Sequence, residues 1–75
     1  MNASSLVHPH RLELRRRHDE LAAQVAELQW NLGGLTYEMA IRDHFRLDVL
    51  VSRAAALQER EIELAELARI LGNEP

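Results

Sequence analysis

The 75-residue chain has no cysteine and no lysine. Without cysteine, these residues cannot form a disulfide framework, a thiolate zinc site or a cysteine nucleophile. All nine basic residues are arginine, and they stand against twelve acidic residues, which leaves a net charge of -3. This acidic balance argues against a general nucleic-acid-binding surface.

Long hydrophobic runs are also missing. No stretch of about 18 apolar residues occurs, and the first residues do not combine a basic segment with an apolar core. We therefore expect neither a membrane span nor a signal peptide, and we predict a cytoplasmic protein.

Proline is absent between Pro9 and Pro75, and most of the residues in that interval are good helix formers. Pro9 disfavours helical geometry at His8, so we expect the helix to begin near His10, and Gly72 is a typical helix stop. The predicted organisation is a flexible N-terminal tail (1–9), a helical coiled-coil module (10–72) and a C-terminal tail (73–75).

Two leucine repeats with seven-residue steps run through this helical region. A seven-residue repeat places apolar side chains on one stripe of a helix, and the stripe is stable only when another helix covers it. In the first repeat, further apolar residues fill the intervening steps of four and three. The predicted oligomer interface comprises Leu14, Leu21, Val25, Leu28, Leu32, Leu35, Met39, Leu50, Leu57, Leu64 and Leu71.

Gly33 and Gly34 interrupt the helix formers and leave two architectures open. The apolar stripe keeps its phase across the pair, which favours a continuous or gently kinked helix. In that case the eleven residues from Met39 to Leu50 are a stutter in the coiled coil, with Arg42 and Arg46 on the stripe. A glycine pair between amphipathic helices is equally an ordinary signal for a helical hairpin.

A second apolar face is confined to the middle of the chain and includes all three aromatic residues. Its steps of four and three place it roughly opposite the leucines. A two-stranded coiled coil would expose such a face, so we predict that it forms a bundle or docks a partner protein. The predicted residues are Trp30, Gly33, Gly34, Tyr37, Ile41 and Phe45.

Residues suited to chemistry are sparse. The four histidines include no pair at the i, i+4 spacing of a helical metal site, so we expect no metal and no cofactor. No grouping of carboxylates and histidines suggests a catalytic site, and we expect no enzyme activity. The segment from Arg11 to Arg17 is similar to a basic region ahead of a leucine zipper, but Glu13 interrupts it and Asp19 and Glu20 follow.

The segment 31–46 reads Asn-Leu-Gly-Gly-Leu-Thr-Tyr-Glu-Met-Ala-Ile-Arg-Asp-His-Phe-Arg. With its Leu-Gly-Gly-Leu step, its Arg-Asp-x-Phe-Arg sequence and the later Ala54-Ala55 run, the chain resembles a group of uncharacterised actinobacterial coiled-coil proteins. The resemblance covers most of residues 11–71. Members often have a zinc ribbon after the helices, which is absent here, and the resemblance implies an assembly or adaptor module.

Together these features predict an all-α protein: a long amphipathic helix with a Gly-Gly kink, or a helical hairpin, assembling as a coiled coil or helical bundle. The predicted function is a homo-oligomerising scaffold or adaptor module that mediates protein-protein interaction. Its expected partners are itself and another protein, with no membrane. The alternative is a small nucleic-acid-associated regulatory factor that uses Arg11 to Arg17.

Overall fold

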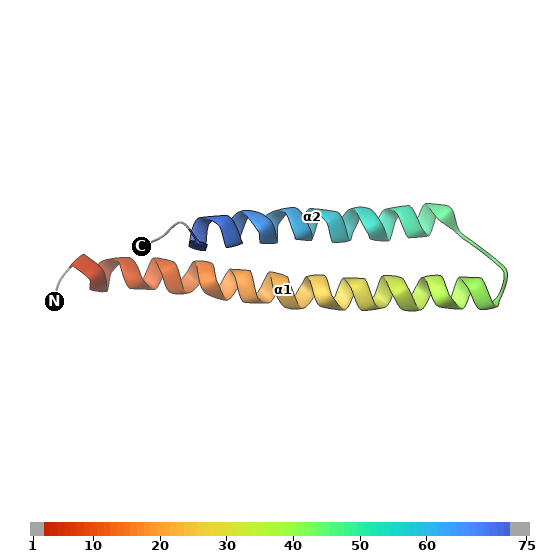
Figure 1. The fold of residues 1–75 in the computed structure, drawn as a ribbon, viewed down its shortest axis with the longest axis horizontal. Coiled ribbons are helices and arrows are strands. Elements are labelled where there is room, and N and C mark those ends of the chain that lie inside the picture. The colour runs from red at the N-terminus through yellow and green to blue at the C-terminus, as the bar shows by residue number, and fades with distance from the viewer. Residues whose placement is uncertain (1–2, 73–75) are drawn as a thin grey trace.

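The computed structural model describes the backbone of residues 3–72 and the side chains of residues 10–72. Helix α1 (Ala3–Ile41) and helix α2 (Leu47–Gly72) lie side by side and run in opposite directions. Figure 1 shows this hairpin, with the first turns of α1 projecting beyond the end of α2. The all-α prediction is confirmed, and the hairpin is the architecture that the chain adopts.

The start of α1 differs from the prediction. The helix begins at Ala3 rather than near His10, so it includes residues 3–9 of the predicted tail. Pro9 does not set the boundary: it lies inside α1, although it has no backbone N–H to donate to the helical ladder. Residues 1–2 and the predicted C-terminal tail (73–75) lie outside the described residues.

The position of the turn also differs from both predicted architectures. Helix α1 passes through Gly33 and Gly34 without interruption, as phase continuity predicted, and both glycines have negative φ. The prediction of a continuous helix to Leu71 is wrong, because the chain reverses between Ile41 and Leu47. The eleven-residue interval interpreted as a stutter therefore spans the reversal.

The reversal begins with a Schellman-type helix end. The amide of His44 donates to the carbonyl of Met39 at 3.0 Å, and the amide of Asp43 donates to that of Ala40 at 3.2 Å. Asp43 has φ of 51°, the left-handed conformation that this motif requires. Asp tolerates that conformation better than most residues do, which allows the helix to end without glycine.

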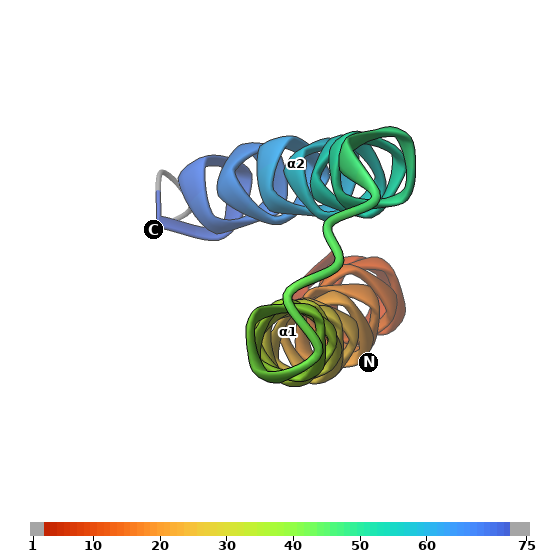
Figure 2. The same cartoon turned by 90° about the vertical axis from the view of Figure 1, so that its right-hand side faces the viewer.

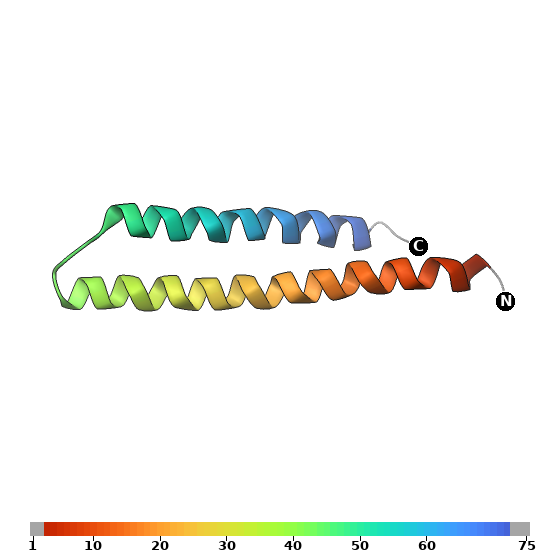
Figure 3. The same cartoon turned by 180° about the vertical axis from the view of Figure 1, so that it is seen from behind.

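A stripe of apolar side chains between the helices forms the core, which we call the seam. Leu21, Val25 and Met39 of α1 and Leu67 of α2 are its buried residues. Viewed from the turn, the helix axes cross (Figure 2), and the view from behind shows that they stay adjacent along the length of α2 (Figure 3). The seam is long and thin, because each helix contributes only one stripe.

Replacing Gly33 or Gly34 with alanine is expected to stabilise the hairpin. A Cβ at either position would meet no atom within 4 Å, and neither glycine has positive φ. Each replacement should raise the free energy of unfolding by about 0.5–1 kcal/mol, because glycine in a helix interior costs that much relative to alanine. Urea unfolding followed by circular dichroism measures the change, and Ala55→Gly, at an exposed position inside α2, is the matched control, with a loss of similar size. A loss with Gly33→Ala would contradict the prediction.

Candidate functional site

The residues predicted for the oligomer interface line the seam of a single chain. Every one of the eleven is buried or half-buried, on helices that contact each other within the chain. Within one chain, α2 covers the α1 stripe. A role for these residues in contacts between chains stays a prediction.

Several seam residues were missed by the sequence analysis. Leu67 is buried, and Val49 and Ile70 are half-buried. Leu67 follows Leu64 by three residues and precedes Leu71 by four, so the alternation seen in the first repeat also runs through the second. His18 occupies the equivalent place between Leu14 and Leu21 and is half-buried.

Polar side chains join the helices along one flank of the seam. Arg17 donates through Nε and Nη2 to Oε2 of Glu63, at 3.1 and 2.9 Å. Arg60 Nε donates to Oε1 of Gln24 at 3.1 Å. The arginine stems cover apolar atoms while their heads stay near water, so these bonds mainly fix the register of the antiparallel pair.

The predicted second face of α1 is open to solvent. Trp30 is 81% exposed, Ile41 is 68% exposed and Tyr37 is 58% exposed. Gly33 and Gly34 are also exposed on this helix, and with Gln29 and Trp30 they line a shallow hollow. The structure thus places five of the six predicted residues on α1, and all five are exposed.

Phe45 is the exception and corrects the predicted face. It lies in the reversal after α1 has ended, so helical spacing does not place it with Trp30 and Tyr37.

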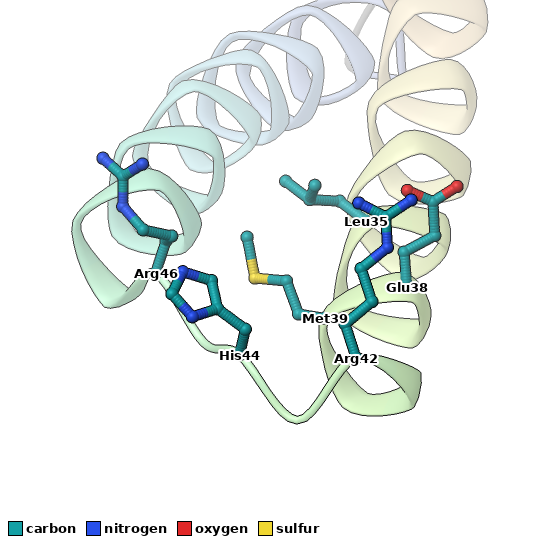
Figure 4. A pocket seen from close by; sticks show the side chains of 6 residues that line it. All are labelled: Leu35, Glu38, Met39, Arg42, His44 and Arg46. Atoms are coloured by element: carbon teal, nitrogen blue, oxygen red, sulfur yellow. The ribbon is translucent and has the colours of Figure 1, made fainter.

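A hollow of about 170 Å³ occupies this end of the hairpin, where Met39 extends from α1 and the His44 ring lies at the turn (Figure 4). Its lining residues are Leu35, Glu38, Met39, Arg42, His44 and Arg46.

An ion pair marks the start of α2. Arg46 donates through Nε and Nη2 to the two carboxylate oxygens of Asp48, at 3.2 and 3.0 Å. These hydrogen bonds hold the pKa of Asp48 below its ordinary value and raise the pKa of Arg46. Both side chains are exposed, so the pair orders the turn more than it stabilises the fold.

The arginine segment is divided by the fold. Arg15, Arg16 and Arg17 are all exposed, and Arg17 is engaged by Glu63 and lies 3.8 Å from Glu20. Acidic side chains therefore neutralise part of the segment on which the nucleic-acid alternative depends.

Comparison of the chain with protein families, curated proteins and solved structures finds no match. The resemblance to actinobacterial coiled-coil proteins therefore stays a prediction. Among the described residues, no three His, Asp or Glu side chains gather at a possible metal site. None of the described helices is both long enough and apolar enough to cross a membrane.

Proposed function

We propose that this chain is a homo-oligomerising α-helical module that serves as a scaffold or adaptor in protein-protein interaction. One observation supports the proposal above the others. Among the residues with described side chains, four hydrophobic residues are buried, whereas eight large hydrophobic residues are more than half exposed.

That distribution is unfavourable for an isolated hairpin. Small domains bury a limited part of their surface, and a chain of this size needs many buried residues, a crosslink or association to be stable. The hairpin has no cysteine and only a single seam. Association would cover further apolar surface and supply the missing stabilisation.

We do not extend the proposal to nucleic acid. Glu63 engages Arg17, and Glu13, Asp19 and Glu20 surround the remaining arginines in the sequence. Such a mixed field weakens the phosphate attraction that supplies most non-specific nucleic-acid affinity.

Sedimentation equilibrium combined with circular dichroism tests the proposal. We expect a highly helical species with at least twice the monomer mass at high micromolar concentration, dissociating and losing helix on dilution. Helix content should fall together with the associated mass, because association stabilises only the folded state and depends on concentration by mass action. A helical species that keeps the monomer mass over the whole micromolar range would contradict the proposal.

A further inference from the structure

The side of α1 that faces away from α2 bears a second stripe, longer than the predicted second face. Leu12, Ala23, Ala26, Trp30, Tyr37 and Ile41 are all exposed. Their separations are sums of three and four residues, as in the seam, so they share one side of the helix. We call these six residues the outer stripe. It spans residues 12–41, slightly beyond both ends of the first seam stripe (14–39).

The outer stripe is complementary to itself when two copies of α1 run antiparallel. With the twofold axis between Ala26 and Glu27, Leu12 lies opposite Ile41 of the second copy. In the same register Ala23 lies opposite Trp30 of the second copy, so that the smallest side chain meets the largest. A twofold axis applies each pairing twice, as in the self-complementary interfaces of symmetric dimers.

Charge supports the same register. Arg16 lies between Leu12 and Ala23 on this side of α1 and comes opposite Tyr37 and beside Glu38 of the second copy. Within the described part of the chain, neither Arg16 nor Glu38 forms an ion pair, and both are exposed. A guanidinium group over an aromatic ring and next to a carboxylate is favourable on both counts.

Two acidic residues are unfavourable in this register. Asp19, between Arg16 and Ala23 on the same side of α1, comes opposite Gly34 of the second copy and loses contact with water. Glu27 lies beside the twofold axis, on the edge of the outer stripe, and comes close to Glu27 of the second copy. Like charges that face each other across an interface weaken association. Removing this charge should therefore strengthen the pairing, which is a result that damage to the fold could not imitate.

We propose that a second copy of this chain docks antiparallel on the outer stripe of α1, centred between Ala26 and Glu27. The dimer then has two α1 helices at its centre and one α2 on each outer side. This inference rests on the proposed self-association and specifies the surface that performs it.

The available area suits a dimer of moderate strength. Leu12, Trp30, Tyr37 and Ile41 are between 58% and 81% exposed. Aromatic side chains each bury about 150–250 Å² and leucine and isoleucine somewhat less, so the four at these exposures supply on the order of 500 Å² per chain. The total of about 1,000 Å² is near the lower limit of a specific interface, and we expect a dissociation constant in the micromolar range.

Single cysteines test the register directly, because the chain has none of its own. Under mild oxidation Ala26→Cys is expected to form a disulfide-linked dimer, since the two positions face each other across the axis. Ala23→Cys is the matched control on the same stripe, with its two copies about 10 Å apart along the helix, too far for a disulfide. Ala65→Cys is the control on α2. Linkage of Ala23→Cys would indicate parallel pairing, linkage of Ala65→Cys would indicate pairing through α2, and either overturns the inference.

A charge exchange gives a second readout in the reduced protein. Arg16→Glu should weaken dimerisation at least about tenfold, and Arg16→Glu combined with Glu38→Arg should restore it, because the exchange recreates the opposed charges. Glu27→Gln should tighten the dimer. Circular dichroism confirms that each variant is helical. The inference fails if the exchange does not restore dimerisation.

Sedimentation of the unmodified chain separates the two proposals. A monomer at high micromolar concentration overturns both the proposed function and this inference. A dimer whose Ala26→Cys variant does not crosslink, or one indifferent to Arg16→Glu and Glu27→Gln, overturns the inference alone.

Discussion

Leu21→Ala is expected to unfold most of the hairpin. Leu21 is the one described side chain that is fully buried, at 0% exposure. Removing a buried leucine side chain costs about 3–5 kcal/mol, because the transfer free energy is lost and a cavity is left behind. A seam with four buried residues has little stability to spare, since whole domains are stable by only about 5–15 kcal/mol.

The position of Leu21 in the register strengthens this expectation. It lies between Arg17 and Gln24, which bond Glu63 and Arg60 on α2. Leu21 therefore faces the turn of α2 between those two partners, and a cavity there would also loosen both polar contacts. The helices could close the space only by approaching each other, which their neighbouring side chains resist.

Thermal and urea unfolding at one fixed chain concentration measure the effect. Ile62→Ala is the matched control, because it also shortens a branched aliphatic side chain but at a position that is 64% exposed on α2. We expect it to change the free energy of unfolding by less than about 0.5 kcal/mol. Equal losses from the two variants would show that the seam does not hold the hairpin together.

Two replacements of Asp43 are expected to change the free energy of unfolding in opposite directions. Asp43→Gly should raise the free energy of unfolding by up to about 1 kcal/mol, because glycine adopts left-handed backbone at no steric cost. Asp43→Val should lower it by about 1–2 kcal/mol, since a β-branched residue is strained at a φ of 51°.

The same unfolding measurements test this pair of changes. The matched control is Glu59→Val in α2, which also replaces an exposed carboxylate with valine, at a residue with helical backbone, and so adds no strain. If Asp43→Gly and Asp43→Val shift stability in the same direction, the left-handed conformation of Asp43 does not determine the turn.

Much of the seam could be predicted from the sequence. The alternation of three and four residues marked the seam residues from Leu21 to Met39 without knowledge of the partner helix. Leu67 could have been found by the same alternation in the second repeat, but the seven-residue step from Leu64 to Leu71 passes over it. The outer stripe was recognised only from Trp30 onward, because Ala23 and Ala26 are small and give little periodic signal.

The turn was the main error, and its cause is physical. Glycine lowers helix stability, which suggested a break at Gly33-Gly34. The penalty is about 1 kcal/mol per glycine, and the packing of the long helix against α2 offsets it. A turn at the glycines would have left the second repeat without enough of the first helix to cover it. Reversal at Asp43 instead aligns the two repeats along the whole of α2.

By itself the sequence determined that the chain is helical and where most of the apolar stripe lies, because helix propensity and apolar spacing are local properties of neighbouring residues. The tertiary structure alone decided that α2 covers α1 within one chain and that Asp43 ends the first helix. Those outcomes depend on the total burial gained by pairing two distant stripes, which no local segment contains.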